Sequence, residues 1–269
     1  MLIPSVITIH MDPVLVQLGP IALRWYGLMY VLGIMAGVWI IRKYANQCGI
    51  NDDQINTLFW PAAIAGFLGG RIYYVIQQPL GPYLQQPWRI LATWEGGMAF
   101  YGCIFGVVLA LLITCWRTKI PHWRVLDAAA LLALPAQGIG RIGNIVNGDV
   151  IGYPAELPWA VQYTHPATFA PSTSVTYHPA AIYELLGNVL IFAILWPLRH
   201  RLRTPGMVFA LYLVGYSIAQ IIIFIWRLNE IVIWELKQAQ VTGIIVAAAG
   251  ILLAIWLRQE SRNRDAQTA

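Results

Sequence analysis

The sequence has few charged residues for its length. Only 11% of its 269 residues are Asp, Glu, Lys or Arg, whereas 58% are hydrophobic. Soluble globular domains usually carry about 25% charged and about 45 to 50% apolar residues. So little charge cannot cover the surface of a soluble domain, which excludes a soluble enzyme, a secreted disulfide scaffold and a disordered chain. The composition predicts a protein that resides in a lipid bilayer.

Cysteine is also scarce. The three cysteines, Cys48, Cys103 and Cys115, have neither CxxC nor metal-ligand spacing. We therefore interpret them as small apolar residues and expect neither a metal nor another cofactor. The N-terminal segment lacks a basic region and a small-residue cleavage site, so we expect the first apolar run to be retained.

Long apolar runs are abundant. A membrane-spanning helix needs about 20 mainly apolar residues. Seven runs meet this length, approximately Ile21–Ile41, Ile55–Ile76, Gly96–Trp116, Val125–Val146, Pro179–Pro197, Gly206–Trp226 and Val241–Leu257. They lack the alternation of barrel strands and are too long for them. The sequence predicts an all-α polytopic membrane protein, with residues 1–269 forming a single domain of seven transmembrane helices.

The basic residues predict the orientation of this bundle. Eleven of the 17 Lys and Arg fall on one side, namely Arg42, Lys43, Arg117, Lys119, Arg124, Arg199, Arg201, Arg203, Arg258, Arg262 and Arg264. The positive-inside rule makes that side cytoplasmic, with the N-terminus outside and the C-terminus inside. This distribution accounts for the net charge of +5 without a nucleic-acid partner. The other six basic residues lie in or near the outer half, where a cationic site is possible.

Two outer connections are long, at about Gln77–Glu95 and Asn147–His178. Loops of this length are usually functional, although a disordered connector is the alternative. We expect residues 147–178 to form a small extracytoplasmic head between the fourth and fifth spans. Its Trp159–Tyr163 segment is predicted to form a short strand.

Four charged residues within the apolar runs require an explanation: Arg71, Asp127, Arg141 and Glu184. A charge in a spanning segment costs at least about 2.5 to 3.5 kcal/mol, which makes each a candidate functional residue. The structural alternative for Arg71 is an arginine whose side chain snorkels to the outer surface. The structural alternative for Asp127 is the N-cap of the fourth span. Glu184 needs a partner such as Arg141.

Arg141 lies in a segment that runs from Gly138 to Gly152 and contains several glycines and two asparagines. Glycines permit a helix break and a close backbone approach, so N–H groups and the amides of Asn144 and Asn147 could converge beside the guanidinium. Arginine matches the oxygens of a phosphate and stays charged when buried. A phosphate site is therefore predicted, with a capped helix end as the alternative. No strand precedes the segment, so it is not a nucleotide-binding fingerprint.

Further polar residues occur near the outer ends of other spans. His178 precedes Pro179, a favoured first residue of a helix, and Glu184 follows about one and a half turns later. A helix-capping or interfacial imidazole is the alternative for His178. The third span begins with the sequence WEGGMAFYG, which ends at Gly102, and the first contains RWYG around Tyr26.

Together these motifs resemble the bacterial prolipoprotein diacylglyceryl transferase family. The resemblance covers nearly the whole chain, through RWYG, GGRIYY, WEGGMAFYG, GRIGNIVNGDVIG, HPAAIYE and PGMVFALYLVGY in that order. The GRxGNxxNGxxxG pattern is the most specific of them.

The resemblance implies an enzyme of the bacterial inner membrane. Family members transfer the sn-1,2-diacylglyceryl group of phosphatidylglycerol to the lipobox cysteine thiol of a preprolipoprotein. A thioether forms and glycerol phosphate is released, in the first step of lipoprotein maturation. The implied partners are phosphatidylglycerol, other membrane lipids and the signal peptide of the preprolipoprotein.

The resemblance also implies the site residues. The catalytic candidates are Arg141, Tyr26, Tyr101, His178, Asp149 and Glu184. The substrate-binding candidates are Arg141, Asn144, Asn147, Gly152, Gly97 and Arg71. Arg141 would bind the headgroup and stabilise the charge that develops on the departing phosphate.

The chain departs from the family pattern in two places. Tyr101 stands where many members have histidine, and its reference pKa of about 10 makes it a poor base for a thiol of about 8.5. His178 or Asp149 is a candidate base, or Arg141 lowers the pKa of the thiol itself. In the sixth span Gln220 and Phe224 replace an arginine and a glutamate, and Arg227 is a candidate substitute.

Two other functions are therefore kept as alternatives. One is a non-catalytic paralogue that binds phospholipid or lipoprotein precursors. The other is a transporter for an anionic solute, although the polar residues gather in the outer half and do not lead to both faces of the membrane.

Overall fold

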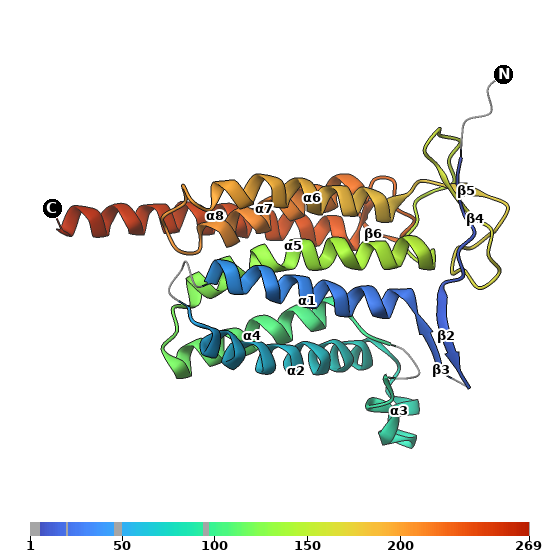
Figure 1. Ribbon diagram of the computed structural model, residues 1–269, viewed down its shortest axis with the longest axis horizontal. Coiled ribbons are helices and arrows are strands. Elements are labelled where there is room, and N and C mark those ends of the chain that lie inside the picture. Colours follow the sequence, from blue (N-terminus) through green and yellow to red (C-terminus); the bar gives the residue numbers. More distant parts are fainter. Residues whose placement is uncertain (1–5, 20, 46–49, 94–96, 269) are drawn as a thin grey trace. The chain divides into compact units, whose positions relative to one another are not determined.

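The computed structural model describes residues 6–19, 21–45, 50–93 and 97–268. The chain divides into two compact units, which are Met1–Ile41 together with Asp127–Ala269, and Arg42–Leu126. Figure 1 labels the elements along the chain. The helices longer than ten residues are α1 (Trp25–Ala45), α2 (Asp52–Gln77), α4 (Phe100–Thr118), α5 (His122–Asn147), α6 (Ala180–Leu198), α7 (Met207–Ile223) and α8 (Gln238–Thr268).

These helices fit a polytopic membrane protein. Five described segments are long and apolar enough to cross a bilayer: Trp25–Ala45, Asp52–Gln77, His122–Asn147, Ala180–Leu198 and Gln238–Arg264. The apolar segments Gly102–Thr118 and Met207–Ile223 are shorter. Each predicted apolar run overlaps one of these helices, because a helix satisfies its own backbone hydrogen bonds within lipid.

The start of the first predicted span was wrong. Residues Ile21–Arg24 form strand β3, which pairs antiparallel with β2 (Val14–Leu18), and α1 begins only at Trp25. Gly19 has a φ of +57° in the turn that joins the two strands. A window of mean hydropathy includes an apolar hairpin strand as readily as a helix, which explains the error.

The other strands of this unit also lie outside the helices. Strand β1 (Ile7–Ile9) pairs parallel with β4 (Val161–Tyr163), and β4 pairs antiparallel with β5 (Thr176–Tyr177). Strand β4 confirms the short strand expected in the head. A short hairpin of β6 (Ile231–Ile233) and β7 (Leu236–Lys237) connects α7 to α8.

Asp127 caps a different helix from the one predicted. It lies in the second turn of α5, and its carboxylate accepts hydrogen bonds from the backbone N–H groups of Gly206 at 2.7 Å and Phe209 at 2.8 Å. Those residues are the N-cap and third residue of α7. Asp127 therefore satisfies free N–H groups at the start of α7, whose positive dipole end favours a carboxylate.

The second unit contains the antiparallel pair α2 and α4 with the short helices α3 (Gly81–Gln85) and η2 (Pro87–Ile90). Asn51 caps α2 and exchanges hydrogen bonds with Gln54 in a capping box. A Cβ atom on Gly69 would lie 2.4 Å from the carbonyl oxygen of Gly102, so α2 and α4 are in backbone contact there. Cys115 is buried and free, as expected for an apolar cysteine, and Cys48 lies outside the described residues.

Candidate functional site

Three charged side chains form an ion cluster in the first unit: Arg141 on α5, Glu184 on α6 and Arg227 shortly after α7. Arg141 Nη2 forms an ion pair with Glu184 Oε2, and Arg227 Nη1 donates to Glu184 Oε1 at 2.6 Å. Glu184 is only 1% exposed. The predicted pairing of Glu184 with Arg141 is confirmed. Because two guanidinium groups share one carboxylate, positive charge exceeds negative charge within the cluster.

Arg227 was not ranked among the site residues. The sequence indicated it only as a candidate substitute for the arginine that Gln220 replaces. Burial lowers the pKa of the Arg227 guanidinium from its ordinary value, and the charge of Glu184 opposes this change. The guanidinium also lies 4.6 Å from the centroid of the Phe224 ring. The chain therefore has a second cation beside Glu184, although Gln220 occupies the position where an arginine was expected.

A buried lysine holds the segment that carries Arg227. Lys237 Nζ donates to the carbonyl oxygens of Phe224 and Arg227, each at 2.6 Å. It thereby satisfies the carbonyl of Phe224, the C-cap residue of α7. Leu228 N–H donates to the carbonyl of Ile151 at 3.1 Å, which joins this segment to the head.

Two asparagines extend the site along the last turn of α5. Arg141 Nη1 donates to Asn144 Oδ1 at 3.2 Å, and Asn144 Nδ2 donates to both carboxylate oxygens of Asp149 at 3.1 Å. These bonds fix the orientation of the Asn144 amide. Asn147 Oδ1 accepts from Arg24 Nη1 at 3.0 Å, so both amides are committed to cations or carboxylates. The helix ends at Asn147, and Gly148 adopts a φ of +74°.

Arg141 also has an unused donor. Its Nε atom is buried and has no hydrogen-bond partner within the described residues. A buried N–H group without a partner costs free energy comparable to a lost hydrogen bond.

Tyr26 lies in the first turn of α1, beside α5. Its hydroxyl donates to Tyr30 Oη at 3.1 Å. A Cβ atom on Gly143 would lie 2.8 Å from the Cα of Tyr26, so the glycine allows α1 to approach α5 closely. The family motif around residue 140 therefore has a packing role as well as a chemical one.

His178 and Gly152 join the head to the start of α6. Gly152 N–H donates to the His178 carbonyl at 2.9 Å, and His178 N–H donates to the Tyr153 carbonyl at 3.0 Å. A Cβ atom on Gly152 would lie 2.4 Å from the carbonyl oxygen of Trp226, so only glycine fits. Burial lowers the pKa of the His178 imidazole below its ordinary value, which keeps the ring neutral at neutral pH.

Arg71, Gly97 and Tyr101 belong to the second unit. Arg71 is only 4% exposed, and its Nε donates to the Ile90 carbonyl at 2.8 Å. Its Nη1 donates to the Gly97 carbonyl at 2.8 Å, and its Nη2 donates to the Arg89 carbonyl at 2.6 Å. These bonds anchor the segment after α3 to α2. Tyr101 is the second residue of α4, and Glu95 lies outside the described residues.

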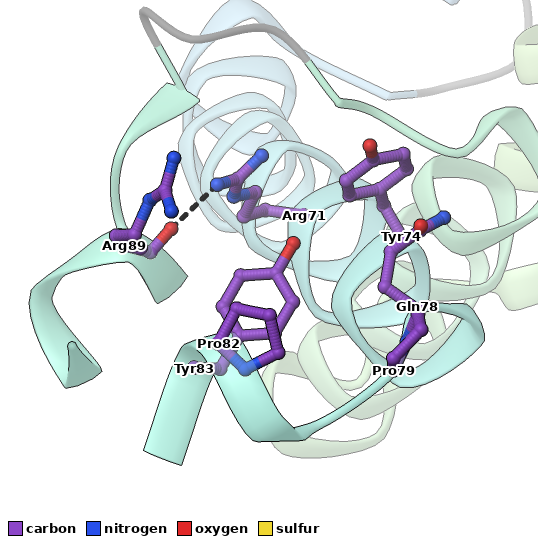
Figure 2. Close-up of a pocket in the computed structure, with 7 residues that line it drawn as sticks. All are labelled: Arg71, Tyr74, Gln78, Pro79, Pro82, Tyr83 and Arg89. Atoms are coloured by element: carbon purple, nitrogen blue, oxygen red, sulfur yellow. Dashed lines mark hydrogen bonds between the residues drawn. The ribbon is translucent and has the colours of Figure 1, made fainter. Parts of the chain in front are cut away.

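Figure 2 shows the guanidinium of Arg71 beside the Arg89 carbonyl, at the edge of a small cavity. The cavity has a volume of about 230 Å³. Its lining residues are Arg71, Tyr74, Gln78, Pro79, Pro82, Tyr83 and Arg89.

Comparison with known proteins identifies the family. Residues 13–256 match the family model described as prolipoprotein diacylglyceryl transferase. A phosphatidylglycerol–prolipoprotein diacylglyceryl transferase of Pasteurella multocida is 40% identical over 220 residues, which cover 80% of this chain and 79% of the relative. The enzyme of the same name from Desulfotalea psychrophila is 34% identical over 95% of this chain and 96% of its own length. The chain belongs to the prolipoprotein diacylglyceryl transferase family.

Proposed function

We propose that this protein transfers the sn-1,2-diacylglyceryl group of phosphatidylglycerol to the lipobox cysteine of preprolipoproteins. The observation that carries the proposal is the ion cluster of Arg141, Glu184 and Arg227, which occurs in a chain of this family. A headgroup phosphate is the anion that such a cluster suits, because guanidinium groups match its oxygens. Family membership also makes the transferase a better account than an anion transporter.

The reaction forms a bond between the cysteine sulfur and the terminal glyceryl carbon. The bond between that carbon and the phosphate oxygen breaks, the thiol proton passes to a base or to solvent, and glycerol phosphate leaves. The enzyme must therefore ionise the thiol and stabilise charge on the departing oxygen. Arg141 and Arg227 supply the positive charge for both tasks, since a nearby cation lowers the pKa of a thiol.

Other residues of the predicted site orient the two arginines. Asn144 holds Arg141 through its carbonyl oxygen and Asp149 through its amide. Glu184 fixes the spacing of the two guanidinium groups by pairing with both. Tyr26 and Asn147 stay predicted members of this site. Arg71 is proposed to anchor its own segment through backbone carbonyls, and the roles predicted for Gly97 and Tyr101 stay predictions. Asp149 and His178 stay as the candidate bases.

The protein is proposed to span the bacterial inner membrane seven times, with its N-terminus outside. The five long apolar helices and the two shorter ones supply seven segments. The basic residues in the last turn of α1, at and after the end of α4, after α6 and within the end of α8 all fall on one side of such a bundle. The ion cluster then lies toward the outer side, where secreted precursors present their cysteine.

A binding-only paralogue is less well supported. The reason to consider it was the loss of an arginine and a glutamate at Gln220 and Phe224. Arg227 provides a guanidinium beside Glu184, so the cluster has two cations despite the substitution.

The test is glycerol phosphate release by the purified protein, with phosphatidylglycerol and a lipobox peptide as substrates. Release is expected with the cysteine peptide and not with its Cys→Ser counterpart. Arg141→Ala should lower kcat/KM by roughly 100- to 1,000-fold, the loss typical of one donor to a developing oxyanion. Arg262→Ala, an exposed arginine on α8, is the matched control and should leave the rate unchanged. Equal rates in the two variants would remove the assigned role of Arg141.

A further inference from the structure

Three aromatic side chains form a hydrogen-bonded chain at the start of α6, where Tyr183 directly precedes Glu184 of the ion cluster. Trp159 Nε1 donates to the hydroxyl oxygen of Tyr183 at 2.9 Å. The same oxygen lies 3.2 Å from Nδ1 of His178. The Trp226 ring flanks the other two partners, with centroids 6.3 Å from both His178 and Tyr183.

The direction of each hydrogen bond follows from the donors available. An indole N–H can only donate, so the Tyr183 oxygen must accept it. The proton of Tyr183 then needs its own acceptor. Among the described residues, His178 Nδ1 is the one acceptor within hydrogen-bond distance of that hydroxyl. A proton on Nδ1 would make His178 a second donor to the Tyr183 oxygen and would leave solvent as the acceptor for the Tyr183 O–H.

We infer that Tyr183 is a positioning residue that fixes His178 as the Nε2–H tautomer, so that His178 acts as a hydrogen-bond donor and not as the base for the thiol. The lone pair on Nδ1 is occupied by the Tyr183 proton, and Nε2 carries a hydrogen. Trp159 holds Tyr183 in the donating orientation.

The surroundings of the imidazole agree with a neutral ring. Tyr183 is the only titratable side chain of the described residues that bonds to it, and no charged side chain of that part of the chain pairs with it. Backbone groups of Gly152 and Tyr153 contact His178 only through its main chain. Burial and the bond from Tyr183 both favour the neutral form.

The role of His178 in catalysis rests on the proposed function. An Nε2–H group can donate a hydrogen bond to the phosphate oxygen that gains charge when the carbon–oxygen bond breaks. The ring keeps its proton throughout, so no other acid or base is needed for this step. The thiol proton then goes to Asp149 or to solvent.

The experiment is nitrogen NMR of the full-length protein labelled with ¹⁵N-histidine in lipid nanodiscs. His178→Gln identifies the signals of His178 among the five histidines. The inference predicts an unprotonated Nδ1 and a protonated Nε2 in the wild type at pH 8. Tyr183→Phe should give a mixture of tautomers, and Trp159→Phe should give a smaller change in the same direction. Tyr163→Phe, a buried tyrosine of β4, is the control and should leave the signals unchanged.

Kinetics supply the second measurement. Tyr183→Phe should lower kcat about tenfold with little change in KM, which corresponds to the loss of about one hydrogen bond. A wild-type ring that carries its proton on Nδ1 would overturn the inference, as would unchanged tautomers in Tyr183→Phe. The tautomer is read without turnover. A protein with the expected tautomer but no transferase activity would refute the proposed function and leave the assignment of Tyr183 intact.

Discussion

Arg71 and Arg141 are both largely buried arginines on apolar helices, but their partners differ. Each guanidinium nitrogen of Arg71 donates to a neutral backbone carbonyl, and those carbonyls belong to one surface segment. Arg141 pairs with the carboxylate of Glu184, which Arg227 shares, and its Nε has no partner in the described part of the chain. Carbonyl partners fix a segment in place, whereas a shared carboxylate leaves positive charge for an anion. From the hydrogen bonds and ion pairs named above, we predict an anchoring role for Arg71 and an anion-binding role for Arg141.

The largest expected effect comes from removing the carboxylate that the two arginines share. Glu184→Ala leaves two like charges close together in a buried site. We expect it to lower the free energy of unfolding by about 3 to 5 kcal/mol, as is usual when one partner of a buried ion pair is removed. Thermal unfolding in detergent measures the change, with the exposed Glu156→Ala as control. Equal stability of the two variants would contradict the described pairing.

The next effect concerns the anchoring arginine. Arg71→Met removes three hydrogen bonds from a charged donor and should lower the free energy of unfolding by about 2 to 4 kcal/mol. At temperatures where the variant is folded, kcat/KM should stay near the wild-type value. A large rise in KM for phosphatidylglycerol with unchanged stability would instead place Arg71 in the substrate site, as its sequence motif suggested.

A smaller effect is expected from the residue that orients Asn144. Asp149→Asn replaces one of two accepting oxygens with a donor, so one of the two bonds from Asn144 Nδ2 is lost. The loss of one hydrogen bond predicts a decrease in kcat/KM of roughly fivefold. Asp52→Asn, an exposed residue at the start of α2, should have no effect. A decrease of more than about 100-fold would show that Asp149 takes the thiol proton, since a lost general base usually costs that much.

The smallest effect is a dependence of stability on pH. His178 has a pKa below its ordinary value of about 6.5, so the folded protein binds fewer protons than the unfolded chain as the pH falls through that range. The contribution of the neutral ring is therefore present above pH 6.5 and is lost toward lower pH. Between pH 7.5 and 5.5 the unfolding temperature of the wild type should fall slightly more than that of His178→Asn. His200→Asn, at an exposed position, should behave like the wild type.

The pairing of Glu184 with Arg141 could be predicted because both residues are costly in lipid. A carboxylate and an arginine in apolar helices require each other, which is why Glu184 and Arg141 were paired before any geometry was known. Arg227 was harder to identify because it lies beyond the end of its helix, where a basic residue costs little. Its role depends on the tertiary contact between Arg227 and Glu184. A local sequence pattern does not specify that contact.

The fold was predicted best where the pattern is long and local. Hydropathy located every long helix, but it extended the first one into β3, where pairing with β2 decides the structure. The partner of Asp127 was missed for a similar reason. Its side chain caps α7 across 79 residues of sequence, whereas capping rules consider only neighbours along the chain.

The central claim is that the Arg141 cluster binds the headgroup phosphate, and binding can be measured without turnover. Native mass spectrometry of the purified protein titrated with phosphatidylglycerol would give the affinities of the wild type, Arg141→Ala and Arg71→Met. We predict that Arg141→Ala weakens binding at least about tenfold, the equivalent of one charge-assisted hydrogen bond, while Arg71→Met binds like the wild type. Wild-type affinity in Arg141→Ala, or a greater loss in Arg71→Met, would contradict the account.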